Sequence, residues 1–294
     1  MTTALRRFAF ALGLTVATSL AAAARAETWT TIDYPGASLT EALGINERGD
    51  VVGRWADTDG DIHGFLLRHG RFASLDVPGA TFTAALDINN LGVVGGRYFD
   101  ADGVSRGFTW KDGRFTQIDF PGAVDTRVRG IDDFGRLTGN YRIEDGIEHG
   151  FLIDRSGSHT IDVPESQATN AWDTNVLGRM VGWGQSETDE IIHGFLLVQG
   201  AFTQIDFPDV KNTRLFGINP QGDIVGEFDD EDDVPHGLLR TRDGMVSLDF
   251  PDGTGTFAFR INAQGDVVGS YLDADGNTHG FLRQSHGKHA ANEE

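Results

Sequence analysis

Short apolar runs, each bounded by glycine together with aspartate or asparagine, follow one another along most of the chain. Val51 to Ala56 leads into the turn Asp57-Thr58-Asp59-Gly60, and Phe72 to Val77 alternates polar and apolar residues. Asx-Gly turns favour hairpins because glycine accepts the positive φ that these turns require. The pattern therefore predicts an all-β chain of short antiparallel strands.

The strands recur as one unit. Its first landmark is an Ile-Asp-aromatic-Pro segment with conservative changes, whose aspartates are spaced by 43, 43, 43, 44 and 43 residues: Asp33, Asp76, Asp119, Asp162, Asp206 and Asp249. A second landmark is the first polar residue of an Ile-Asn-x-x-Gly turn: Asn46, Asn89, Asp132, Asn175, Asn219 and Asn262. A third precedes a Gly-Phe or Gly-Leu pair: His63, Arg106, His149, His193, His236 and His279. Four strands in about 43 residues match one propeller blade, so six units predict a six-bladed β-propeller.

The phase of the repeat predicts how the ring closes. The last unit ends at Phe281-Leu282-Arg283 without an Ile-Asp-x-Pro strand, and the chain after residue 26 opens with that strand alone. We therefore expect the N-terminal strand to complete the last blade, with Trp29–Asp33 beside Gly280–Arg283. Closure of this kind removes free sheet edges.

These units resemble the HAF-repeat family of probable extracellular bacterial proteins, named for a His-Ala-Phe tripeptide. The matching residues are His63-Gly64-Phe65 and the preceding Asn46-x-x-Gly49-x-Val-Val-Gly53 stretch, with glycine in place of the family's alanine. The resemblance covers about residues 28–287. It implies an exported β-propeller, and it brings no established activity or catalytic residues.

The N-terminus has the features of a secretory signal. Arg6 and Arg7 precede an apolar run from Phe8 to Ala24, and Ala24-Arg25-Ala26 supplies a small-x-small cleavage pattern. We expect a signal peptide over 1–26, a propeller over 27–287 and a polar tail over 288–294. The expected location is the periplasm or the extracellular medium, without a membrane anchor.

The amino-acid composition limits which partners and cofactors the protein can bind. The chain of 294 residues has no cysteine, which excludes disulfides and thiolate chemistry, and 39 glycines, many of them in the repeated turns. A net charge of −20 argues against nucleic acid as a partner, and we expect a monomer. The hairpins between the second and third strands are rich in acids and should all emerge on one face. We expect no required cofactor; calcium is the candidate ion, at the acidic run Asp229, Asp230, Asp232 and Asp233.

Function is sought in the residues that differ between repeats, on the innermost strand, because only that strand brings six units together. Arginine there can hold a carboxylate or sulfate, tryptophan can stack on a sugar ring, and carboxylates can transfer protons. The candidate ligand-binding residues are Glu41, Asp87, Arg127, Arg129, Asn170, Trp172, Asp173, Arg214 and Arg260.

Two alternatives stay open at these positions. The charged side chains can pair with one another and plug the channel, or they can line a pocket. The favoured function is a non-catalytic binding module for a glycan or protein ligand; the other is a polysaccharide hydrolase or lyase that uses carboxylates at the channel mouth, with or without calcium. The repeated histidines lie too far from the axis to share one metal ion, so we expect them to be structural.

Overall fold

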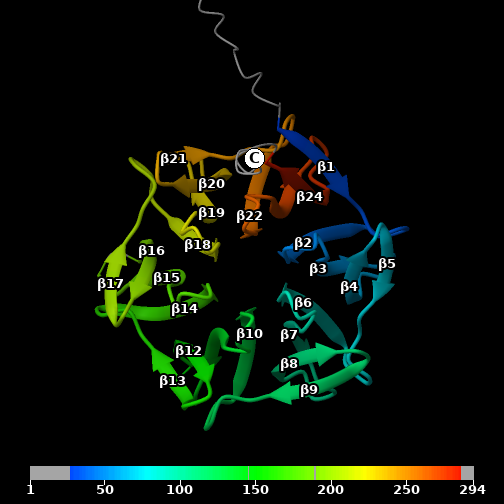
Figure 1. The fold of residues 1–294 in the computed structure, drawn as a ribbon, viewed down its shortest axis with the longest axis horizontal. Coiled ribbons are helices and arrows are strands. Elements are labelled where there is room, and N and C mark those ends of the chain that lie inside the picture. The colour runs from blue at the N-terminus through cyan, green and yellow to red at the C-terminus, as the bar shows by residue number, and fades with distance from the viewer. Residues whose placement is uncertain (1–26, 145, 189, 286–294) are drawn as a thin grey trace, which may run out of the picture.

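The computed structural model describes residues 27–144, 146–188 and 190–285. The predicted signal peptide and the tail over 288–294 lie outside the described residues. Six four-stranded antiparallel sheets surround a central axis, so the chain is a six-bladed β-propeller, as predicted (Figure 1). In the described part of the chain, no helix is both long and apolar enough to cross a bilayer.

Each blade is given from the axis outward. The first three are β2 (Leu39–Ile45), β3 (Val51–Ala56), β4 (Ile62–Arg68) and β5 (Arg71–Ser74); β6 (Phe82–Ile88), β7 (Val94–Phe99), β8 (Ser105–Lys111) and β9 (Arg114–Ile118); and β10 (Asp125–Ile131), β11 (Leu137–Arg142), β12 (Glu148–Asp154) and β13 (Gly157–Ile161). The last three are β14 (Ser166–Thr174), β15 (Met180–Ser186), β16 (Ile192–Val198) and β17 (Ala201–Gln204); β18 (Thr213–Ile218), β19 (Ile224–Asp229), β20 (Pro235–Thr241) and β21 (Gly244–Ser247); and β22 (Gly255–Ile261), β23 (Val267–Leu272), β24 (Thr278–Gln284) and β1 (Thr28–Ile32).

The ring closes through the N-terminal strand. β1 pairs antiparallel with β24, with Trp29 opposite Arg283 and Ile32 opposite Gly280. The predicted pairing of the two chain ends is therefore confirmed, and the outer edge of β24 is covered.

The core of each blade is a buried side chain on the third strand, after the His-Gly or Arg-Gly pair. These residues are almost fully buried: Phe65, Phe108, Phe151, Phe195, Leu238 and Phe281. The second strand makes room with a glycine. A Cβ at Gly53 would lie 2.7 Å from the Phe65 ring and would also collide with the Glu41 carbonyl, so only glycine fits there.

A threonine on each innermost strand holds the chain that enters its blade. Its hydroxyl accepts the backbone N–H of the residue after the repeated aspartate, at 2.9–3.2 Å in all six cases; Thr40 accepts from Tyr34, for example. The pairing fixes the connection between blades, which explains why the aspartate segment and the inner strand recur at constant spacing.

The first polar residues of the Ile-Asn-x-x-Gly turns form a continuous hydrogen-bonded ring, here called the amide ring. In five blades the asparagine Nδ2 donates to the backbone carbonyl of the equivalent residue in the next blade, at 2.9–3.4 Å. Asn262 donates to Asn46 and so closes the circle. Asp132 has no amide to donate, and Arg136, four residues later, donates to the Asn175 carbonyl instead, at 2.8 Å.

This substitution in the third blade generates a matched test. Asn175→Asp places an aspartate four residues before Arg179, which repeats the Asp132–Arg136 arrangement. Asn219→Asp places an aspartate four residues before Asp223, which offers no donor and adds repulsion. We expect Asn219→Asp to lower the free energy of unfolding by about 1–3 kcal/mol, as for a lost buried hydrogen bond, and Asn175→Asp to lower it much less.

The measurement is urea unfolding at pH 7 followed by tryptophan fluorescence. Equal losses in the two variants would contradict the role given to the ring.

Candidate functional site

The channel has two dissimilar ends. Connections between second and third strands emerge on one face, here called the hairpin face, where each innermost strand begins; the amide ring lies on the opposite turn face, where it ends. All six acidic hairpins therefore share a face, as expected. A pocket of about 440 Å³ opens at the turn face and one of about 370 Å³ at the hairpin face.

Near the turn face, glycine alternates with a charged residue from one blade to the next, and the three charged side chains fill the axis. The position two residues before each turn residue is Gly44, Asp87, Gly130, Asp173, Gly217 and Arg260. A Cβ at Gly44 would lie 2.7 Å from the Asp87 Cα, and Gly130 and Gly217 meet the next blade in the same way. Three glycines thus allow the neighbouring strands to approach and to direct the other three side chains to the axis.

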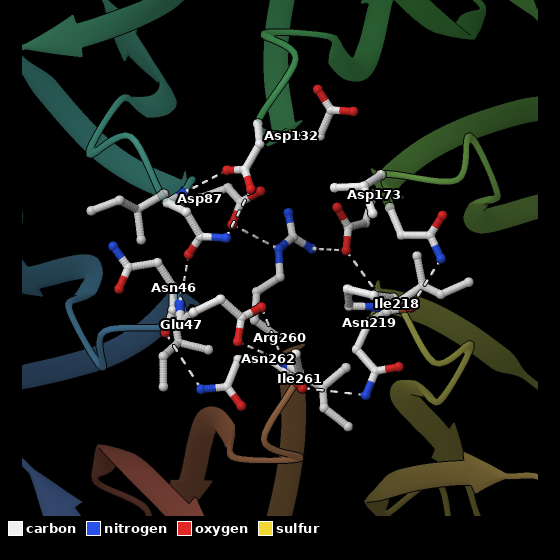
Figure 2. Close-up of a pocket in the computed structure, with 18 of the residues that line it drawn as sticks. Asn46, Glu47, Asp87, Asp132, Asp173, Ile218, Asn219, Arg260, Ile261 and Asn262 are labelled. Atoms are coloured by element: carbon white, nitrogen blue, oxygen red, sulfur yellow. Dashed lines mark hydrogen bonds and ion pairs between the residues drawn. The ribbon is translucent and has the colours of Figure 1, made fainter.

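Arg260 occupies the centre of this layer (Figure 2). Its guanidinium lies 3.0 Å from the Asp87 carboxylate and 3.8 Å from that of Asp173, and it donates to the backbone carbonyls of Phe216 and Arg129. Each carboxylate also accepts a backbone N–H from a neighbouring blade, at Ile131 and Ile218. All three side chains are buried, so these charges pair with one another and plug the channel.

Burial dominates the protonation of Asp173. Desolvation raises its pKa to about 6, against the lowering effect of Arg260, with a further upward contribution from the charge of Asp87. Arg260 is therefore a single cation that pairs with both carboxylates, those of Asp87 and Asp173.

At the hairpin face, the channel-mouth pocket joins an aromatic wall to charged groups. It is lined by Glu41, Arg129, Trp172, Trp183, Arg214, Phe216, Glu227, Phe257 and Phe259. The Trp172 and Phe216 ring centroids are 4.4 Å apart, and those of Phe216 and Phe259 are 5.5 Å apart. The aromatic residues all come from β14, β15, β18 and β22, so the aromatic wall lies on one side of the mouth, where Arg214 and Glu227 also line the pocket.

Most of the charged groups near the mouth have partners. Glu41 pairs with Arg54, and Arg214 lies 2.9 Å from Glu227. Glu227 is buried, and desolvation raises its pKa to about 7, against the lowering effect of Arg214 and with the charge of Asp229 adding to the rise.

Glu148 joins two of the predicted residues. It accepts from Arg127 at 2.6 Å and from Asn170 at 2.8 Å.

Arg129 differs from these charged groups. Its guanidinium lies 4.3 Å from the centroid of the Trp172 ring, and its Nε donates to Asn140 at 3.1 Å. Desolvation, followed by the positive charges of Arg97 and Arg127, holds its pKa well below the usual value. Arg129 is therefore a partly desolvated cation, and among the described residues no carboxylate is in ion-pair contact with it.

The nine predicted residues thus separate into groups. Asp87, Asp173 and Arg260 form the plug; Glu41, Arg129, Trp172 and Arg214 line the mouth; Arg127 and Asn170 meet at Glu148 beside it. Sequence reasoning did not place Trp183, Glu227 or Arg97 among the ligand-binding candidates. They occupy the residue after the second-strand glycine, which lies opposite the variable inner position in the strand register and varies between blades in the same way: Arg54, Arg97, Asn140, Trp183, Glu227 and Ser270.

The acidic run proposed for calcium already has protein partners. Asp229 accepts from Asn212 and Arg214, Asp230 accepts from two backbone N–H groups and lies 3.3 Å from His236, and Asp233 pairs with Lys211. Within the described ranges, no three His, Asp or Glu side chains are arranged to hold a metal ion. Calcium binding by Asp229, Asp230, Asp232 and Asp233 stays a prediction.

Three of the repeated histidines, His63, His236 and His279, join two loops within their own blades, and His149 and His193 contact the repeated aspartate. In the last blade, His279 Nδ1 lies 3.0 Å from Asp33 and Nε2 lies 3.2 Å from Asp273, and its ring stacks on Tyr271. Arg106 replaces the histidine in the second blade and reaches Asp100 and Asp119 in the same manner. His63 and His279 also line pockets between neighbouring blades, of about 410 and 230 Å³, and His193 lines a pocket of about 330 Å³ between its own blade and the connection that enters it.

Comparisons with known proteins bear on the fold. No protein-family model and no curated protein matches the chain, so the HAF-repeat resemblance stays a prediction. AofleA from Arthrobotrys oligospora is 13% identical, with a TM-score of 0.55 over 87% of this chain and 86% of that one. The SapL1 lectin, solved with α-methyl fucoside, is 12% identical, with a TM-score of 0.53 over 80% and 89%.

A third solved structure is Aleuria aurantia lectin, described as a six-bladed β-propeller with a novel fucose recognition mode. It is 10% identical, with a TM-score of 0.50 over 82% of this chain and 90% of that one. At such identities the likeness shows the fold alone, and the class of this protein is the six-bladed β-propeller.

The plug generates a test of stability against pH. Arg260→Met leaves two buried carboxylates without their cation, so we expect a loss of about 3–5 kcal/mol in the free energy of unfolding at pH 7.5. Because burial raises the pKa of Asp173 in the folded state, protonation relieves the penalty, and the loss should shrink at pH 5. The triple variant Asp87→Asn/Asp173→Asn/Arg260→Met should recover part of the stability; a pH-independent loss in the single variant would contradict this account.

The histidines generate a second pH prediction. Burial would lower the pKa of His236 and of His279, but paired aspartates outweigh it and raise both above 6.5. Their stabilising contribution is therefore complete below pH 6.5 and is lost as the pH rises through the folded-state values. His236→Arg/His279→Arg reproduces the natural Arg106 of the second blade at both positions and removes this titration. The decline in melting temperature between pH 6.5 and 8.5 should be smaller in that variant than in the unmodified protein; an unchanged decline would contradict the assignment.

Proposed function

We propose that the protein is an exported carbohydrate-binding propeller whose ligand site is the channel-mouth pocket. The observation that carries the proposal is the wall of Trp172, Phe216 and Phe259 beside Arg129, Arg214, Glu41 and Glu227. Sugar rings present apolar C–H faces and polar hydroxyls, so an aromatic surface next to charged hydrogen-bonding groups suits them. The N-terminal sequence that ends at Ala24-Arg25-Ala26 supports export.

The structural neighbours support the same class of ligand. SapL1 was solved with a fucoside, and Aleuria aurantia lectin is described by its fucose recognition. The plug formed by Asp87, Asp173 and Arg260 supports a site at the mouth, because its charges are already paired with one another and none of the three residues lines the mouth pocket.

A glycan array followed by calorimetric titration tests the proposal. Trp172→Ala and Phe259→Ala should each weaken binding of the best array ligand by roughly 10-fold, as expected for a lost stacking surface. Phe134→Ala is the matched control, because Phe134 is an exposed aromatic residue in a turn on the opposite face. Absence of binding to every glycan, or equal affinity in all three variants, would refute the proposal.

The second candidate is a polysaccharide hydrolase or lyase, and Glu227 is the observation that favours it. A carboxyl with a pKa of about 7 is suited to give or take a proton near neutral pH, and Glu41 lines the same pocket. Asp87 and Asp173, the other carboxylates among the predicted residues, line the opposite pocket. If the protein releases new sugar ends from a polysaccharide panel and Glu227→Gln abolishes that release while binding persists, the enzyme is the better description.

A further inference from the structure

Besides Arg214, four arginines of the first three blades gather near the mouth of a protein whose net charge is −20. They are Arg54 and Arg97 on β3 and β7, and Arg127 and Arg129 on β10. The positive charges of Arg97, Arg127 and Arg54 all contribute to lowering the pKa of Arg129, and Arg97 occupies the strand position at which Trp183 and Glu227 line the pocket in their blades. The hairpin face therefore has a cationic region inside an acidic rim.

Two of these arginines are neutralised and two are not. Arg54 pairs with Glu41, and Arg127 pairs with Glu148. In the part of the chain that the structure describes, Arg97 and Arg129 have no carboxylate in ion-pair contact. Desolvation, reinforced by the charges of Arg127 and Arg54, lowers the pKa of Arg97 to about 10. Such a cation destabilises the empty protein, because its lost hydration is not replaced by a counter-charge.

Aromatic rings hold both free guanidinium groups in place. Arg97 lies 4.8 Å from the centroid of Phe82 and 5.4 Å from that of Phe99, and Arg129 stacks on Trp172. The cross-strand neighbour of Arg97 is Ala84, where the first blade has Glu41, so no side-chain acceptor faces it from the inner strand. Contact with a ring face does not use the N–H edges of a guanidinium; at Arg129, Nε already donates to Asn140, which leaves the two Nη groups to bind a ligand.

Resting on the proposed function, we propose that the glycan bound at the mouth is anionic, with its carboxylate or sulfate held by Arg97 and Arg129 while the aromatic wall receives the sugar ring. Arg129 belongs to both parts, because it lines the pocket and stacks on Trp172. An anion supplies the missing counter-charge, and it does so in a partly desolvated place where charge-assisted hydrogen bonds are strong.

The experiment uses arrays and calorimetry with three sets of oligosaccharides: neutral, uronate-containing and sulfated. Anionic ligands should bind more tightly than neutral ones, and their affinity should fall as sodium chloride rises from 20 to about 300 mM, because salt screens the attraction. The uronate and sulfate sets show which anion is preferred. Binding of neutral glycans alone would overturn this inference and leave the proposed function standing; binding of no glycan would remove both.

Variants place the anion at the two free arginines. Arg97→Met/Arg129→Met should weaken anionic glycans roughly 10- to 100-fold and remove most of the salt dependence, whereas neutral glycans, which lose only the hydrogen bonds and the Trp172 contact of Arg129, should weaken much less. Its melting temperature in the absence of ligand should not fall, because unpaired cations are replaced by apolar side chains of similar length. Arg114→Met on the outer strand β9 is the matched control and should bind normally. Unchanged affinity in the double variant, or equal losses for neutral and anionic glycans, would overturn the inference. Tight binding of acidic peptides with no binding of acidic sugars would also overturn it.

Discussion

The amide ring is the interaction on which the rest of the molecule depends. Five asparagines, and Arg136 in the third blade where the asparagine is absent, join each turn to the next blade by hydrogen bonds. The last of these bonds joins residues 216 positions apart in the chain. Together with the pairing of β1 and β24, this ring sets the distance of all six innermost strands from the axis. At each height along the channel, the six innermost strands therefore place six equivalent residues around the axis at a fixed distance from it.

The role of the six equivalent positions at each level depends on whether the same residue recurs in all six blades. Where the same residue recurs, as with the threonine that receives the incoming chain or the core phenylalanine, these positions build the scaffold. Where the residues differ between blades, the six equivalent positions form a specific feature. At one level this feature is the plug of Asp87, Asp173 and Arg260, and at another it is the aromatic wall and the charged groups of the mouth. Repeated histidines belong to the first kind, since Arg106 makes the same contacts in the second blade.

Sequence reasoning predicted the fold because blade number, strand order and closure follow from spacing, which is independent of side-chain conformation. It placed the candidate residues on the innermost strands, which line both ends of the channel, but it did not separate the plug from the mouth. A register shift on each innermost strand, such as that between Ala171 and Asp173, is not visible in the spacing; Trp172, within this shift, lines the mouth, whereas Asp173 lines the turn-face pocket. Glu227 and Arg97 were missed because they lie on the second strand, where they meet the inner strand only through cross-strand pairing.

A structure of the protein with an acidic oligosaccharide is the most direct test of the central claim, that the channel mouth is the ligand site. The account predicts the sugar ring against Trp172 and Phe216, with its anionic group between Arg97 and Arg129. A ligand found in the pockets between blades, beside His63 or His279, with the mouth empty, would contradict it.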